Sequence, residues 1–81
     1  MELQHLPWAK DDDVCGEAAG FAFGDRSLDL VVTYCADGTF AWEVIDDLCA
    51  DERIAFGTAA SVAEARRAAE AAGRRTFIRA A

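Results

Sequence analysis

Carboxylates are the groups in this 81-residue chain that are most numerous and most closely spaced. Acids in pairs can perform general acid-base catalysis or bind divalent cations. They occur as "DDD" at positions 11–13 and within "EVIDDLCADE" at positions 43–52. The second stretch lacks the alternate ligand spacing and central glycine of an EF-hand loop. We therefore expect no metal site and no cofactor. The acids of the second stretch are interpreted either as a solvated loop that also keeps an edge of the sheet from pairing with other chains, or as part of a contact surface.

Other groups that could react are scattered through the sequence. His5 is the only histidine and has no nucleophile motif near it, so we expect it at the surface. Cys15, Cys35 and Cys49 are odd in number and lack the paired spacing of a zinc site, which predicts reduced and mostly buried thiols. The sequence therefore predicts a protein that is not an enzyme.

The formal charge of −7 is unevenly distributed along the chain. Residues 1–60 hold thirteen acids against three bases, a balance of −10, whereas residues 61–81 have a balance of +3. A polyanion is repelled by most of such a surface, and a basic protein groove is attracted to it. We predict that the contact to a basic protein or nucleoprotein complex is made by Asp11, Asp12, Asp13, Glu43, Asp46, Asp47, Asp51 and Glu52. The alternative is a nucleic-acid site that uses Arg66, Arg67, Arg74 and Arg75.

A β-hairpin is indicated by two alternating runs, "LDLVVTY" at 28–34 and "FAWEV" at 40–44. A three-residue loop, 36–38, pairs Tyr34 with Phe40 and Val32 with Trp42, which puts both apolar sets on one face. Gly38 then occupies the left-handed position of this turn. A third strand is predicted over "RIAFGTA" at 53–59, with Ile54 and Phe56 facing the core, to complete a meander over 27–60.

A helix is predicted from Ser61, which with Glu64 forms a capping box, to Gly73, which closes it. Its buried stripe comprises Val62, Ala65, Ala69 and Ala72. Residues 74–81 are predicted to add a short strand, and residues 1–26 to be less regular, with a loop over 9–20, a short strand at Phe21 and Phe23, and a buried Trp8. The fold class is therefore α+β in a single domain, 1–81: an antiparallel three- to four-stranded β-meander packed on one C-terminal helix.

The meander followed by "GTAASVAEARRAAEAAGRR" is similar to small proteins of high-GC bacteria and their phages. The compact, acidic character resembles phage-encoded anti-CRISPR proteins. This resemblance implies a non-catalytic inhibitor, acting as a DNA mimic in the cytoplasm of a bacterial host, that blocks the nucleic-acid site of a basic complex such as a CRISPR effector. It transfers no functional residue.

No apolar run reaches the ~20 residues of a membrane span. A homodimeric assembly protein is the remaining alternative.

Overall fold

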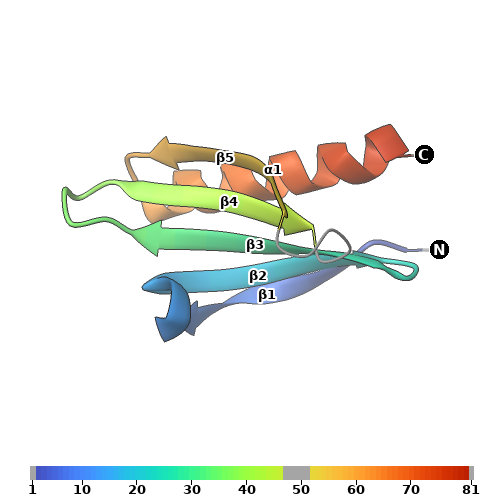
Figure 1. The fold of residues 1–81 in the computed structure, drawn as a ribbon, viewed down its shortest axis with the longest axis horizontal. Helices are drawn as coiled ribbons and strands as arrows, with labels where there is room; N and C mark the ends of the chain where they lie inside the picture. Colours follow the sequence, from blue (N-terminus) through green and yellow to red (C-terminus); the bar gives the residue numbers. More distant parts are fainter. Residues whose placement is uncertain (1, 47–51, 81) are drawn as a thin grey trace.

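The computed structural model describes residues 2–46 and 52–80, and the side chains of these except at 78–80. Within this part of the chain, five antiparallel strands form one sheet in sequence order, and one helix covers one of its faces (Figure 1). The predicted α+β meander with a C-terminal helix is confirmed, with more strands than expected. The elements are β1 (Gln4–Asp11), the short 3-10 helix η1 (Asp12–Val14), β2 (Gly16–Phe23), β3 (Arg26–Tyr34), β4 (Phe40–Asp46), β5 (Glu52–Ala59) and α1 (Val62–Ala80).

The hairpin of β3 and β4 has the predicted register. Tyr34 pairs with Phe40 and Val32 with Trp42. The Cys35 amide donates to the carbonyl of Thr39 at 3.0 Å, which closes the three-residue loop. Gly38 has φ 86°, a conformation that is open to glycine at little cost. The hydrophobic pattern and the turn chemistry thus agree on one register.

The first 26 residues are more regular than predicted, since β1, η1 and β2 occupy most of them, including the expected loop at 9–20. In β2, Phe21 lies opposite Leu28 of β3, and Ala19 opposite Leu30. Most of the other residues of β2 are alanine and glycine, so its alternation in side-chain size is faint in the sequence. The ladder of backbone hydrogen bonds does not require large side chains, and it forms here because β3 supplies a complete neighbouring strand.

The prediction that Ile54 and Phe56 face the core is wrong. β5 places Ala55 opposite Val44 and Gly57 opposite Trp42, with a bulge where the register shifts beside Val44. A Cβ at Gly57 would lie 2.8 Å from the Trp42 ring, so the indole occupies the space that a side chain on β5 would need. Phe56 therefore lies on the opposite face, and it is 65% exposed.

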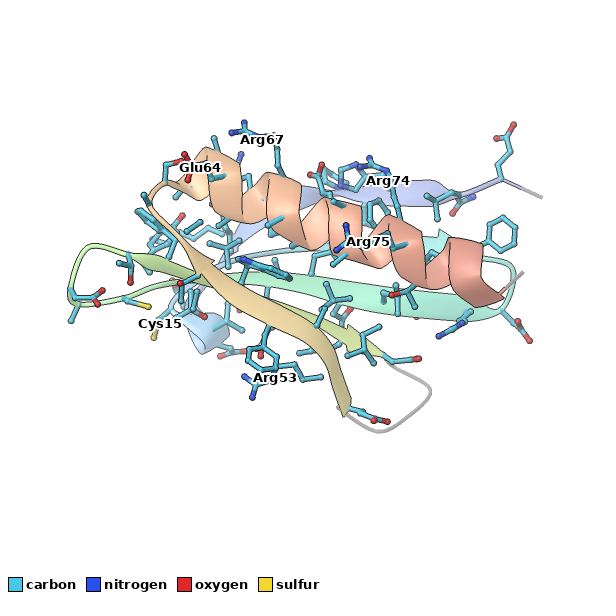
Figure 2. The ribbon with its side chains drawn as sticks, turned by 90° about the horizontal axis from the view of Figure 1, so that it is seen from above. Cys15, Arg53, Glu64, Arg67, Arg74 and Arg75 are labelled. Atoms are coloured by element: carbon cyan, nitrogen blue, oxygen red, sulfur yellow. The ribbon has the colours of Figure 1, made fainter. Side chains whose placement is uncertain are left out.

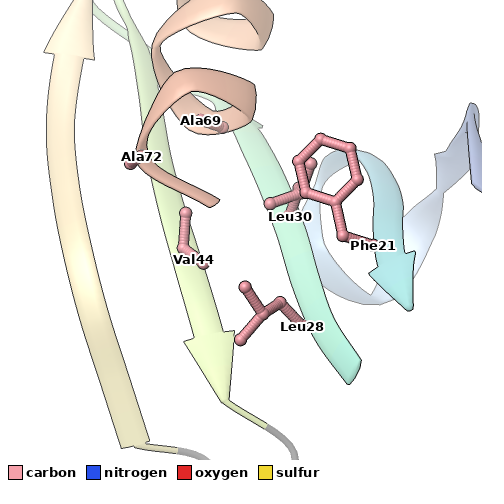
Figure 3. Packing of buried hydrophobic residues seen from close by; sticks show 6 residues of the cluster. All are labelled: Phe21, Leu28, Leu30, Val44, Ala69 and Ala72. Carbon is pink, nitrogen blue, oxygen red and sulfur yellow. The ribbon is translucent and has the colours of Figure 1, made fainter. Parts of the chain in front are cut away.

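The core lies between α1 and the central strands (Figure 3). The helix contributes Ala65, Ala69 and Ala72, which are buried as predicted. Because these side chains are short, the helix axis approaches the sheet closely enough to contact its large residues. On the sheet the fully buried side chains are Phe21, Leu28, Leu30, Val32 and Val44.

The helix does not end at Gly73, and residues 74–80 continue it instead of forming a strand. A Cβ at position 73 would lie 2.8 Å from the Phe21 ring and 3.3 Å from a methyl of Leu30. Gly73 is therefore a site of close helix-sheet packing rather than a helix cap. Beyond it, the Phe77 ring packs 5.9 Å from the ring of Phe23, which gives the added turns an apolar contact.

The start of α1 agrees with the prediction, because the Ser61 hydroxyl accepts from the Glu64 amide at 3.2 Å. Within residues 2–46 and 52–80, no helix has the length and apolar character needed to cross a bilayer.

Candidate functional site

The predicted acidic contact residues fall into two groups at opposite ends of a molecule 39 Å long (Figure 1). Asp11, Asp12 and Asp13 lie where β1 connects to β2. Asp46 and Glu52 lie at the other end, as the terminal pair of the β4–β5 ladder. Glu43 lies on β4, while Asp47 and Asp51 are outside the described residues. The predicted contact residues that the structure describes therefore do not form one continuous surface.

Two of these acids, Asp46 and Glu43, form ion pairs with arginines of the same molecule. Asp46 is 4% exposed, and its Oδ2 accepts from Nη2 of Arg26 at 2.9 Å. The prediction that Asp46 belongs to an exposed surface is wrong, because its position opposite Leu28 turns it toward the helix-covered face. Glu43 lies on the uncovered face of the sheet, 3.5 Å from the guanidinium of Arg53.

The group beside η1 is fixed to the sheet by its backbone. The Thr33 hydroxyl donates to the Val14 carbonyl at 3.0 Å, and the Tyr34 amide donates to the Cys15 carbonyl at 3.0 Å. These bonds hold the β1–β2 connection against the end of β3, from which the β3–β4 turn follows. Both connections therefore lie at the same end of the sheet, and we call their carboxylates the acidic end: Asp11, Asp12, Asp13 and Asp37.

Two carboxylates of the acidic end also shape its backbone. Oδ1 of Asp11 accepts from the Asp13 amide at 3.0 Å. Oδ1 of Asp37 accepts from the hydroxyl and the amide of Thr39 at 2.6 and 3.0 Å. These bonds, first that of the hydroxyl, lower the pKa of Asp37 below its ordinary value. Asp12 and Asp13 are exposed, and neither side chain accepts from a backbone amide of the described residues.

Most basic side chains are paired with the chain's own acids. Within the described residues, five lysines and arginines form such ion pairs: Lys10 with Asp12, Arg26 with Asp46, Arg53 with Glu43, Arg66 with Glu17, and Arg74 with Glu70. Only one of these pairs involves the acidic end, and its members are 3.8 Å apart and highly exposed. Exposed pairs of this kind contribute little binding energy.

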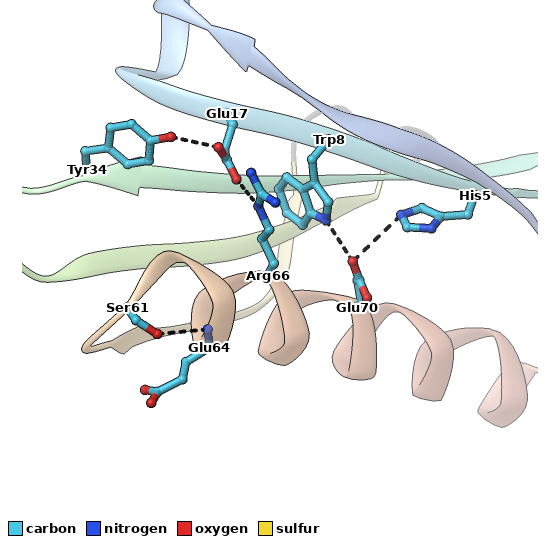
Figure 4. Close-up of polar contacts among 8 residues, drawn as sticks. All are labelled: His5, Trp8, Glu17, Tyr34, Ser61, Glu64, Arg66 and Glu70. Atoms are coloured by element: carbon cyan, nitrogen blue, oxygen red, sulfur yellow. Dashed lines mark hydrogen bonds and ion pairs between the residues drawn. The ribbon is translucent and has the colours of Figure 1, made fainter.

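A second polar cluster joins α1 to β1, β2 and β3 (Figure 4). We call it the polar seam, and its members are His5, Trp8, Glu17, Tyr34, Arg66 and Glu70. Glu17 is 5% exposed; it accepts from the Tyr34 hydroxyl at 2.7 Å and from the Arg66 guanidinium. The Arg66 bond is the main cause of a lowered pKa of Glu17, against the effect of burial. The Glu17 carboxylate in turn raises the pKa of Tyr34.

The other half of the polar seam is centred on Glu70. Its Oε2 accepts from the indole of Trp8 at 2.7 Å and lies 3.8 Å from Nε2 of His5. Trp8 is half-buried, in partial agreement with the predicted burial, and the Arg66 guanidinium lies 5.7 Å from the centre of its ring. Sequence reasoning did not select Glu17 or Glu70. A signal was present for Glu17, since it is the one charged residue in an otherwise small and apolar strand.

The four arginines of the alternative site are not equally available. Arg66 and Arg74 pair with Glu17 and Glu70. Arg67 and Arg75 are exposed on the helix and form no ion pair with the residues that the structure describes (Figure 2). Two unpaired arginines are fewer than a phosphate-binding surface ordinarily presents.

A shallow hollow of about 470 Å³ lies on the uncovered face, across β3, β4 and β5. On its β5 side the Arg53 guanidinium stacks 4.3 Å from the centre of the Phe56 ring. Its side chains are the Phe56 ring, threonine and alanine, and the Glu43–Arg53 ion pair, a lining that suits an apolar or aromatic side chain better than a charged small molecule. The hollow is lined by Thr33, Ala41, Trp42, Glu43, Arg53, Phe56, Gly57 and Thr58.

The cysteines differ from their predicted burial. Cys15 is exposed, because it follows η1 in a left-handed conformation, φ 54°, at the edge of the acidic end. Cys35 is partly buried, both thiols are free, and Cys49 lies outside the described residues. In the described part of the chain, no three histidine, cysteine or acidic side chains gather closely enough to hold a metal ion.

Comparison with protein-family models, with curated proteins and with solved structures gives no match to this chain.

Proposed function

We propose that this chain is a non-catalytic, phage-type inhibitor that binds a basic nucleic-acid-handling protein complex, such as a CRISPR effector, and blocks its nucleic-acid site. The acidic end is the observation that supports this proposal. The two segments that form it, 11–15 and 35–39, contain four acids and no base. Hydrogen bonds from the Thr33 hydroxyl and the Tyr34 amide to backbone carbonyls of the first segment hold it against β3.

The mechanism is competition for a positively charged groove. A duplex carries about one negative charge per ~1.7 Å of its axis, and proteins line the groove that receives it with lysine and arginine. Clustered carboxylates on a rigid domain compete for the same groove and associate rapidly through electrostatic steering. Four of the five internal ion pairs support this role, because they engage arginines with acids other than Asp12 and Asp13.

The distribution of reactive groups also favours binding over catalysis. His5 contacts Glu70 in the polar seam, whereas Cys15 lies beside η1 in the acidic end. A nucleophile and its general base must be within hydrogen-bonding distance of each other to act together. On this proposal the chain works in the cytoplasm of a bacterial host.

The test is a matched pair of charge reversals. Asp12→Lys with Asp13→Lys alters the acidic end, and Glu2→Lys with Asp25→Lys makes the same change in net charge on exposed residues outside the predicted contact set. Inhibition of target-duplex binding by a purified CRISPR effector is measured for both variants. We expect the first variant to lose inhibition by more than tenfold and the second by less than threefold. Equal losses would contradict a defined acidic contact, and a wild-type chain without inhibition would contradict the proposal for this class of partner.

A further inference from the structure

The two edges of the sheet are built differently. The outer strand β1 contains Pro7, and its register shifts between Leu6 and Ala9. Proline offers no amide hydrogen, and a bulge twists an edge away from a flat pairing partner, so this edge opposes further strand addition. The other outer strand, β5, runs for eight residues without proline.

The β5 edge is also apolar and exposed. Ile54 is 37% exposed, and Phe56 is 65% exposed, the highest value among the large hydrophobic side chains of the described residues. In this part of the chain β5 is paired with β4 alone. Half of its backbone amides and carbonyls therefore form a row along the outer side, and such a row is a template for another strand.

The charges along this edge permit contact between identical molecules. Glu52 and Arg53 are the charged residues of β5, and they sum to zero in a chain whose net charge is −7. Arg53 is further engaged with Glu43 and with the Phe56 ring. Two copies that meet at β5 thus avoid the strong local repulsion that the acidic end would produce.

We propose that β5 pairs antiparallel with β5 of a second copy, to give one continuous sheet with both helices on the same face. A two-fold axis at Phe56 pairs the two strands along most of their length. In the stretch after the bulge, paired side chains lie on the same face of the continuous sheet. The two Phe56 side chains then lie directly opposite each other, as a cross-strand aromatic pair. This inference does not depend on the proposed function.

The experiment measures the oligomeric state by sedimentation velocity over a wide range of protein concentration. We expect a monomer–dimer equilibrium in which Phe56→Asp raises the dissociation constant by more than tenfold. Leu6→Asp is the matched control, because Leu6 is similarly exposed, at 55%, but lies on the β1 edge. Ala18→Asp is a second control on β2, far from β5 in the same sheet. It should leave an edge-to-edge dimer unchanged.

Hydrogen exchange of the wild-type chain is an independent measurement that requires no variant. Amides of β5 should gain protection as concentration rises, while those of β1 should not. Salt separates this inference from the proposed function, because screening the charge of −7 strengthens the dimer and weakens binding to a basic partner. A chain that stays monomeric at all concentrations, or a dimer broken by Ala18→Asp or Leu6→Asp instead of Phe56→Asp, would overturn the proposal.

Discussion

The helix meets the sheet in two regions of different chemistry. Over the central strands, Ala69, Ala72 and Gly73 contact Phe21 and Leu30 without a polar group between them. Along the β1–β2 flank the contact is the polar seam, where Glu17 and Glu70 accept hydrogen bonds from opposing elements (Figure 4).

The two regions respond differently to substitution of their residues. The apolar region depends on shape and buried area, and any change of volume there alters the packing of the whole core. The polar seam depends on the direction of its hydrogen bonds, and at its exposed residues water can replace some of these bonds. We therefore expect the apolar region to supply most of the stability, and the polar seam to determine how the N-terminal strand docks against the helix.

Leu30→Ala should give the largest effect. Leu30 is 0% exposed at the centre of the apolar region, and its truncation leaves a cavity that costs about 2–5 kcal/mol of unfolding free energy. Urea unfolding followed by circular dichroism measures this loss. The control is Leu6→Ala on the exposed edge, for which we expect a loss within about 0.5 kcal/mol. Similar losses at both positions would remove the distinction between core and edge.

Gly73→Ala should have a smaller effect on stability, and the sign of that effect reports how tightly residue 73 packs against Phe21. Alanine is favoured over glycine by about 1 kcal/mol in the interior of a solvated helix. Here the added Cβ would lie 2.8 Å from the ring of Phe21, and overpacking of this kind costs about 1–3 kcal/mol. Thermal unfolding should therefore show a net destabilisation. An equally or more stable variant would show that Phe21 has room to move aside, and that the apolar region is packed more loosely than described.

Glu17→Gln should give a smaller loss than Leu30→Ala and one comparable with that of Gly73→Ala. The amide keeps the shape and can still accept a hydrogen bond, but it removes the charge that faces Arg66, at a cost of about 1–2 kcal/mol. Urea unfolding near neutral pH measures this change. Arg67→Gln serves as the control, since Arg67 is exposed on the same helix without an ion pair among the described residues. A loss as large as that of Leu30→Ala would show that the polar seam is as important to stability as the core.

The pH dependence of stability gives a second test of the hydrogen bonds that Glu17 accepts from Tyr34 and Arg66. The pKa of Glu17 is lowered in the folded chain, so its stabilisation is present above the unfolded pKa of 4.5 and is lost as pH falls through the folded value. The pKa of Tyr34 is raised, so its contribution is complete below 10.0 and is lost as pH rises through the folded value. Unfolding free energies measured against pH should show Glu17→Gln flattening both limbs. A profile parallel to that of the wild type would contradict the pairing.

Much of the architecture was predictable from particular residues. Alternation in β3 and β4, together with Gly38, determines the hairpin register, because only one loop length places both apolar sets on one face. Ser61 and the alanine stripe similarly predict where α1 starts and which side it buries. These signals are local, so they do not depend on the rest of the fold.

Other features had no local signal. Gly73 has the residue type of a helix end, yet it lies inside α1 because Phe21, fifty-two positions earlier, requires the space. The Trp42 ring covers the inner face of β5 at Gly57, so the side chain of the adjacent Phe56 lies on the outer face. The acids of the candidate site were identifiable as residues, but the burial of Asp46 and the division of the others between two ends depend on where the strands terminate.

Residue type and spacing along a few turns or strands are enough to set the central hairpin, the helix start, the buried alanine stripe and the excess of acids over bases. Packing between the elements sets which glycines allow close contact, which carboxylates are buried in ion pairs and which edge of the sheet is left open. Those outcomes depend on the contact of side chains distant in sequence, since volume and charge are matched between elements rather than within them.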